Sequence, residues 1–250
     1  MKSFVFFLLL VFFIITSFIS LNDFLSEQKK FERVRTAYKE KGTFIEEQLK
    51  KSNIRIGELQ ILITVYKEEQ ELEIYAKNRS DKSYKKLLTY KICESSGVLG
   101  PKRRKGDYQV PEGFYYMDRF NPASSFYLSL GINYPNKSDR IKSSAKDLGG
   151  DIFIHGECVT IGCMPMTNDK IKEIYLYAIQ AKHNGQNQIP VYIYPFKMAE
   201  DNFRKHELKY NDNKPLISFW TNLKSGHDKF FKDQTALKVT VLENGDYCFN

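Results

Sequence analysis

The chain has 250 residues, of which 42% are hydrophobic and 14% aromatic, and its formal net charge is +8 at pH 7. This length suits one catalytic domain with extensions, and the apolar content excludes a wholly disordered chain. A basic surface attracts nucleic acid, anionic lipid or an acidic polymer alike, so charge does not choose among them. The sequence has no arginine-rich arm, zinc-finger spacing or aromatic RNA-binding motif, and we therefore expect no nucleic-acid partner.

The first segment predicts export from the cytoplasm. Lys2 precedes an apolar run over Phe4–Ile15 that continues less purely to Leu21, which is typical of a secretory signal peptide. No Ala-x-Ala cleavage site precedes Asn22, and about 20 apolar residues are long enough to span a bilayer. Residues 1–21 are therefore either a signal peptide or an anchor in the inner membrane. In both cases we expect the rest of the chain in the periplasm or cell envelope.

Residues 22–52 are polar and charged, with apolar residues at near-helical spacing, which predicts one or two helices. Alternating apolar residues then predict strands. Leu59–Tyr66 and Leu72–Lys77 flank a charged turn and are expected to form a hairpin, and Leu87–Cys93 follows as a third strand. Gly97–Gly113 is expected to be a long loop, and loops of this length without secondary structure are usually functional.

The second half alternates short strands with helices. The clearest helix follows Cys163, where Thr167 or Asn168 can cap it and Gly185 can end it. Residues 200–250 are mixed and contain the apolar spacing of one amphipathic helix. The further strands that we expect are Phe114–Met117, Phe126–Gly131, Ile152–His155 and Ile189–Tyr194.

The segment 151–169 carries the residues with the clearest chemistry. An apolar strand ends at His155, and the sequence Thr160-Ile161-Gly162-Cys163 leads towards the helix. Nucleophilic catalysis by cysteine requires a thiolate, a nearby base and donors for the oxyanion. Cys163 is the candidate nucleophile, His155 the candidate base, and main-chain amides around Gly162 and Cys163 the candidate oxyanion hole. We expect the dipole of the following helix to favour the thiolate.

Structural roles for the same residues remain open at this point. The four cysteines Cys93, Cys158, Cys163 and Cys248 permit three full pairings, and the sequence does not choose among them. A Cys158–Cys163 disulfide would make the segment structural or redox-active, although this spacing is not the Cys-x-x-Cys of thiol oxidoreductases. A metal site from His155, Cys158 and Cys163 lacks a standard zinc spacing and a fourth ligand. We therefore expect no metal and no organic cofactor.

The combination of His155-Gly156 with Thr160-x-Gly162-Cys163 resembles the active-site motif of the L,D-transpeptidase (YkuD-type) family. The closer similarity is to the YafK-like branch of this family, and it extends over most of the chain after the apolar N-terminal segment. The motifs that carry this closer similarity are Gly100-Pro101-Lys102, Gly106-Asp107, Pro111-Glu112-Gly113-Phe114-Tyr115, Asn121-Pro122, Tyr134-Pro135-Asn136, Asp139-Arg140, Cys163…Met166-Thr167 and Ile174-Tyr175.

The resemblance implies an α+β fold. The expected domain is the β-rich L,D-transpeptidase (YkuD-type) domain of mixed sheets, with a helix after the catalytic cysteine and flanking N- and C-terminal helices. Together with the pattern along the chain, it divides the sequence into four parts. These are a signal peptide or membrane anchor over 1–21, a helical segment over 22–52, a catalytic domain over 53–199 and a C-terminal helical extension over 200–250.

The resemblance also implies an activity. Cys163 maps to the family's nucleophile and His155 to its general base, the Gly156 carbonyl orients the imidazole, and Gly162 lies in the oxyanion region. Family members attack a diamino acid in a peptidoglycan tetrapeptide, expel D-alanine and pass the acyl group to an amine or to water. Some YafK-like members detach a lipoprotein from peptidoglycan. We expect a transpeptidase or a related hydrolase whose partners are peptidoglycan stem peptides and a peptidoglycan-linked lipoprotein.

The alternative is a non-catalytic peptidoglycan-binding envelope protein that uses the same cleft. Two positions also depart from the commoner family motif. Ile161 stands where many members have a second histidine, so His155 must act alone, and Met164-Pro165-Met166 replaces the usual arginine after the cysteine. Ordinary turn and ion-pair chemistry explains several candidate substrate-binding residues as well as substrate binding does. These candidates are Arg140, Tyr134, Asn136, Lys102 and Thr160.

Overall fold

The computed structural model describes residues 23–250, so the expectations for the signal peptide or anchor over residues 1–21 lie outside the described residues. Within the described range, no helix combines the length and the apolar character that are needed to cross a membrane. The elements in chain order are α2 (Asp23–Lys29), α3 (Glu32–Lys51), the 3-10 turn η2 (Ile56–Glu58), β1 (Leu59–Tyr66), β2 (Glu71–Asn78), β3 (Lys85–Lys91), β4 (Gly113–Asn121), β5 (Ser129–Ile132), α4 (Lys137–Lys142), β6 (Phe153–His155), β7 (Met164–Pro165), α5 (Asn168–His183), β8 (Pro190–Tyr194), α6 (Glu200–Lys209), α7 (Lys214–Asp233), β9 (Val239–Val241) and β10 (Tyr247–Phe249).

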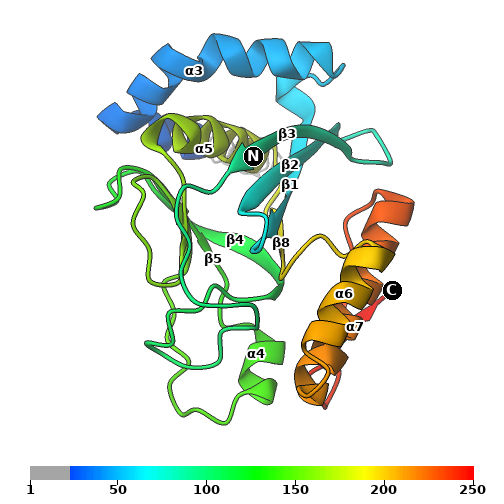
Figure 1. Ribbon diagram of the computed structural model, residues 1–250. Helices are drawn as coiled ribbons and strands as arrows, with labels where there is room; N and C mark the ends of the chain where they lie inside the picture. Colours follow the sequence, from blue (N-terminus) through cyan, green and yellow to red (C-terminus); the bar gives the residue numbers. More distant parts are fainter. Residues whose placement is uncertain (1–22) are drawn as a thin grey trace, which may run out of the picture.

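A curled mixed sheet forms the centre of the molecule. Its strands run in the order β3-β2-β1-β8-β4-β5-β6-β7. The β1–β8 and β6–β7 pairs are parallel, and the other neighbours are antiparallel. Helices α3 and α5 lie together on one side of the sheet, and α6 and α7 run side by side along another (Figure 1). The predicted α+β fold with mixed strands, a helix after Cys163 and helices flanking the domain is confirmed.

The two central strands β1 and β8 are buried on both faces, because successive side chains of a strand point to opposite sides. The apolar side chains on one face of these strands pack against α3 and α5, and those on the other face pack against α6 and α7. The first set is Leu59, Ile61, Ile63, Val65, Val191 and Ile193. The second set is Leu62, Tyr66, Tyr192 and Tyr194.

Helix α5 is the most deeply buried helix of the domain, and it fixes the segment that follows Cys163. The Thr167 side chain accepts a hydrogen bond from the Lys170 amide and caps the helix, as the sequence predicts. Gly185, with φ +92°, lies just beyond its C-terminal end. The buried residues of α5 face both α3 and the sheet, so this helix joins the N-terminal layer to the strands.

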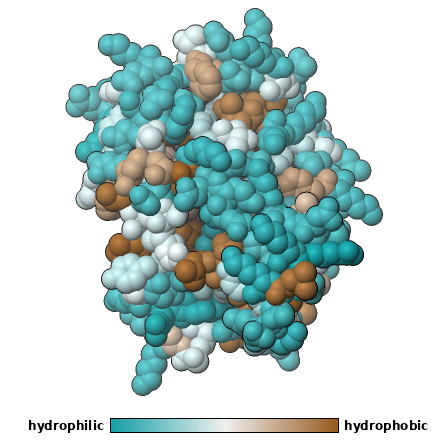
Figure 2. All heavy atoms as spheres, in the orientation of Figure 1, coloured by the Kyte–Doolittle hydropathy of each residue, from teal (hydrophilic) through white to brown (hydrophobic). Residues whose placement is uncertain are grey.

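Several short elements were not predicted from the sequence, among them η2 and the strand β7 directly after Cys163. Helix α4 is held by a capping box between Asn136 and Asp139, and its six residues are too few to show a period. Helix α6 buries only Phe203 and His206, so its polar sequence carries almost no apolar stripe. Strands β9 and β10 pair with each other at the C-terminus. On the face drawn in Figure 2, apolar side chains gather only in small patches among hydrophilic ones.

Candidate active site

Neighbouring strands bring His155 and Cys163 to one cavity. His155 ends β6, and Cys163 directly precedes β7, which pairs with β6 in parallel through Ile154 and Met164. Because the two strands are parallel, the loop between them leads from the end of β6 back to the start of β7. His155, Thr160 and Cys163 all line a cavity of about 520 Å³. The two residues predicted as base and nucleophile therefore face the same space.

The main chain of Gly156 orients the His155 imidazole. His155 is buried, and its Nδ1 lies 2.6 Å from Gly156 O. A carbonyl only accepts hydrogen bonds, so Nδ1 carries the proton and the Nε2 lone pair is available as a base. The Phe126 ring packs against the imidazole, with the ring centroids 4.7 Å apart. A Cβ on Gly156 would lie 2.5 Å from Asn168 Oδ1 and 2.9 Å from Phe126 O, so only glycine fits there.

Burial favours the neutral forms of both side chains. Burial lowers the pKa of His155, and the contact with the Gly156 carbonyl only partly opposes this. Burial likewise raises the pKa of the Cys163 thiol, while a main-chain hydrogen bond from Phe153 lowers it by a smaller amount. The thiol donates to Asp151 O at 3.6 Å. A neutral thiol and a neutral imidazole at one cavity suit a general-base mechanism, because the proton is then transferred during attack.

The expectation that a helix dipole favours the Cys163 thiolate is wrong. Cys163 leads into strand β7, and α5 begins only at Asn168. The dipole effect falls off within the first turn of a helix, so it does not reach the sulfur strongly enough to offset burial. The raised pKa of Cys163 agrees with this placement.

The Thr160 hydroxyl holds the peptide units around the nucleophile. Its Oγ1 accepts from the amides of Gly162 at 3.1 Å and Cys163 at 2.8 Å, and it donates to Cys163 O at 2.9 Å. Gly162 has φ +134°, and a Cβ there would lie 2.9 Å from Gln109 O. The two amides predicted as oxyanion donors are thus already paired. An oxyanion reaches them only where the Thr160 hydroxyl moves aside.

A disulfide between Cys93 and Cys158 ties the loop between base and nucleophile to the end of β3. The Cys93 amide also donates to Pro165 O at 3.0 Å, two residues after Cys163. Cys163 and Cys248 are free. Among the pairings that the sequence leaves open, this structure has Cys93–Cys158 and not Cys158–Cys163. Within residues 23–250, no cluster of three or more metal-ligating side chains is present.

Three cavities meet at Cys163, which lines each of them. The cavity of about 520 Å³ contains His155. A second, of about 230 Å³, runs between the β1–β2 turn and the loop over residues 94–99. A third, of about 490 Å³, lies between the loops around Lys102 and Gly149. Cys163 is therefore a half-buried residue at the junction of three cavities.

The candidate substrate-binding residues fall into two groups. Thr160 lines the His155 cavity, and Lys102 lines the third cavity, where its ammonium is buried and donates to Asp107 at 2.6 Å. Arg140, Tyr134 and Asn136 line none of the cavities that reach Cys163. Arg140 is exposed on α4.

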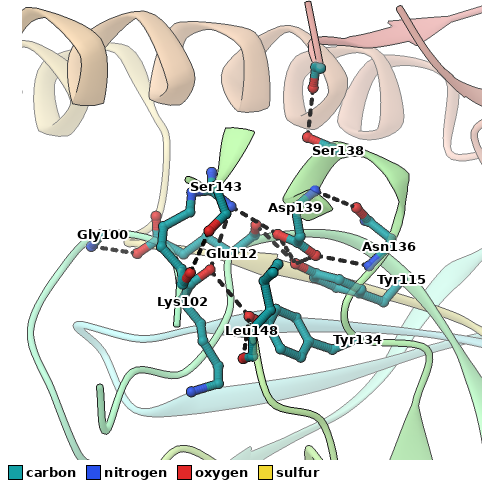
Figure 3. A network of polar contacts seen from close by, with 12 residues as sticks. Gly100, Lys102, Glu112, Tyr115, Tyr134, Asn136, Ser138, Asp139, Ser143 and Leu148 are labelled. Atoms are coloured by element: carbon teal, nitrogen blue, oxygen red, sulfur yellow. Dashed lines mark hydrogen bonds and ion pairs between the residues drawn. The ribbon is translucent and has the colours of Figure 1, made fainter. Parts of the chain in front are cut away.

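Tyr134 and Asn136 belong to a buried polar network that holds α4 to the sheet (Figure 3). The Tyr134 hydroxyl donates to Leu148 O at 3.2 Å. Asn136 caps α4 and donates to Phe114 O at 3.1 Å. The centre of this network is Asp139, whose pKa burial raises to about 6 although an arginine lies beside it. These contacts explain Tyr134 and Asn136 as structural residues that hold α4 in place.

Sequence reasoning did not identify Phe126 or Asp151 as parts of the site. Phe126 contacts the imidazole across a long sequence separation, and no local pattern marks such a contact. Asp151 has φ +55°, its carbonyl accepts from the Cys163 thiol, and its side chain pairs with Arg119 at 2.7 Å. The preceding Gly149-Gly150 pair is the local signal that could have indicated an unusual turn there.

With this geometry in place, comparisons with known proteins assign the class. Residues 60–193 match the family model YkuD, described as the L,D-transpeptidase catalytic domain. The chain belongs to this L,D-transpeptidase family. It is similar to a protein of Escherichia coli (strain K12) that carries the provisional name L,D-transpeptidase YafK. The two are 41% identical over 189 residues, which cover 75% of this chain and 72% of the relative.

Two solved structures are also similar. One is the helical cell shape determining protein Pgp2 from Campylobacter jejuni, with 19% identity, a TM-score of 0.44 and coverage of 74% of each chain. The other is Bd1075 from Bdellovibrio bacteriovorus, with 22% identity and a TM-score of 0.38. That match covers 61% of this chain and 56% of the other.

Proposed function

We propose that this chain is a cell-envelope enzyme that acts on peptidoglycan stem peptides through a thioester on Cys163. The observation that carries the proposal is the shared cavity of Cys163 and His155, in which the Gly156 carbonyl fixes Nδ1 as the protonated nitrogen. Membership of the L,D-transpeptidase family supports peptidoglycan as the substrate. The apolar N-terminal segment and the envelope role of this family support export.

The first half-reaction begins from the neutral pair. The Cys163 sulfur attacks the carbonyl carbon of a diamino-acid residue while His155 Nε2 takes the thiol proton. The resulting imidazolium is stabilised by its hydrogen bond to Gly156 O. As the carbonyl oxygen gains negative charge, the amides of Gly162 and Cys163 exchange the Thr160 hydroxyl for it. The tetrahedral species then collapses, the amine leaves with the proton from His155, and a thioester remains.

The second half-reaction restores the thiol. Water or a second amine attacks the thioester carbonyl, His155 takes the proton of the attacking group, and this proton returns to the Cys163 sulfur as it leaves. An amine gives a crosslink or an exchanged residue, and water gives hydrolysis. Where the leaving amine is the side chain of a peptidoglycan-linked lipoprotein, the same steps detach that lipoprotein. We place this chemistry in the unit over 53–199, with no metal and no organic cofactor.

Turnover of defined substrates tests the proposal. The purified protein is incubated with tetrapeptide muropeptides and with lipoprotein-linked muropeptides, and products are identified by mass spectrometry. Cys163→Ala is the inactive variant, and Cys248→Ala is the matched control that removes the other free thiol. We expect product from the wild type and the control but not from Cys163→Ala. Wall binding without product in all three proteins would favour the non-catalytic binding protein instead.

A further inference from the structure

A fully buried carboxylate, Glu112, joins the C-terminal helices to the smallest of the three cavities. Its Oε2 accepts from Trp220 Nε1 of α7 at 2.9 Å. Its Oε1 accepts from Lys67 Nζ at 2.8 Å and from the Gly100 amide at 2.7 Å, and the contact with Gly100 is drawn in Figure 3. Both carboxylate oxygens are therefore satisfied, and their three partners come from the β1–β2 turn, the loop before β4 and helix α7.

The Lys67 ammonium is the second part of this arrangement. Besides Glu112, it donates to Gly100 O at 2.7 Å and to Val110 O at 2.9 Å, so all three of its N–H groups are used. Lys67 and Val110 line the cavity of about 230 Å³ together with Cys163. The loop that ends at Gly100 forms the opposite wall. The Glu112–Lys67 pair thus holds two walls of this cavity together.

A second contact links α6 to the same wall. Glu68 follows Lys67 and lines the cavity, and its Oε2 lies 2.9 Å from His206 Nε2, which donates to it when the imidazole is protonated because Nδ1 faces Asn202 O. His206 is fully buried and stacks on Phe196, with ring centroids 3.7 Å apart. Helices α6 and α7 therefore each place one buried nitrogen against a carboxylate, although neither helix lines the cavity.

We propose that Trp220 is a positioning residue for the Cys163 site. Through Glu112 it holds Lys67 and Gly100, and so fixes the shape of the cavity through which one of the peptides reaches the sulfur. This inference rests on the proposed function, which it deepens by assigning the C-terminal helices a part in substrate binding. Removal of the indole N–H leaves a buried carboxylate oxygen without a partner, which shifts Glu112 and the loop that it holds.

Trp220 is the only tryptophan of the chain, so it can be replaced by an analogue throughout the protein. β-(3-Benzothienyl)alanine keeps the shape of the ring system and lacks the N–H. The replacement is made in a Cys248→Ser background, which leaves Cys163 as the free thiol. Trp220→Phe serves as a second variant. Phe230→Leu is the matched control, because Phe230 is buried on the same helix and packs against Tyr75 rather than Glu112.

Two readouts separate positioning from simple destabilisation. With peptide substrate, we expect the analogue to raise KM about tenfold and to leave kcat nearly unchanged. The second readout is the rate of Cys163 alkylation by a bulky maleimide relative to iodoacetamide, which reports the shape of the cavity without turnover. We expect this ratio to change in the analogue and in Trp220→Phe, and to stay at the wild-type value in Phe230→Leu.

An unchanged KM and an unchanged alkylation ratio in the analogue would overturn the inference. Equal effects of Phe230→Leu and the analogue would also overturn it, because they would indicate loss of stability alone. If the wild type turns over no peptide, the proposed function fails, and the alkylation ratio still decides whether Trp220 shapes the cavity.

Discussion

The Cys93–Cys158 disulfide gives the most quantitative prediction, because the sequence separation of its cysteines sets the size of the loop that it closes. The two residues are 65 positions apart. In the chain-entropy treatment, closing a loop of this size stabilises the folded state by about 4 kcal/mol. Domains are typically stable by only about 5–15 kcal/mol, so this is a large share. Replacing both residues by serine is therefore expected to lower the urea midpoint by about 1–2 M.

The assay is urea unfolding followed by the fluorescence of the buried Trp220. Both proteins carry Cys163→Ser and Cys248→Ser, so neither contains a free thiol that could exchange with the disulfide. The comparison is then between a chain with the bridge and a chain with serine at both of its positions. Equal midpoints, with equal slopes, would refute the assignment of this bridge as a stabilising crosslink.

Four further predictions follow from the candidate active site and from the buried polar network around Asp139. In a Cys248→Ser background, iodoacetamide alkylates Cys163 with a pH midpoint above that of an ordinary thiol, because burial raises its pKa; a midpoint near 8.5 or lower contradicts this. Burial lowers the pKa of His155, so kcat/KM persists as pH falls through 6.5 and is lost only below it; an acid limb centred above 6.5 would argue against His155 as the base. Burial raises the pKa of Asp139 to about 6 from 3.8, so the folded state binds its proton more tightly than the unfolded chain does. The wild type therefore loses roughly 3 kcal/mol relative to Asp139→Asn as pH rises from about 4 to above 6, and parallel urea midpoints over that range would disprove it. Thr160→Val is expected to lower kcat/KM about tenfold, while Thr160→Ser keeps the hydroxyl and most of the activity; equal rates in the two variants would exclude the positioning role.

The larger elements could be predicted from the sequence because their patterns are local. The alternation in residues 59–66 and 72–77 marks the β1–β2 hairpin, and the Thr167 cap marks the start of α5. The apolar spacing around Trp220 likewise marks α7. Helix α4 was missed because six residues, held by a capping box, are too few to show a period.

The sequence predicted that Cys163 and His155 lie together, but it did not predict the electrostatics around them. The motif around Cys163 and His155 is contiguous in sequence, and the structure places both side chains at one cavity. The direction of the pKa shift of the Cys163 thiol was not predictable, because it depends on burial and on where α5 begins rather than on the motif. Contacts between distant segments were also not predictable from the sequence. The Cys93–Cys158 pairing and the link between Glu112 and Trp220 each join parts of the chain that no local pattern connects.

The most direct test of a Cys163 thioester is the intact mass of the protein during turnover. The purified protein is mixed with a tetrapeptide donor, quenched in acid within seconds and weighed, and the modified residue is located by peptide mapping. We expect a mass gain on Cys163 equal to the donor minus the released terminal amino acid, and no adduct in Cys163→Ala. Product formed by Cys163→Ala at the wild-type rate, or an acyl group found on another residue, would contradict the proposed mechanism.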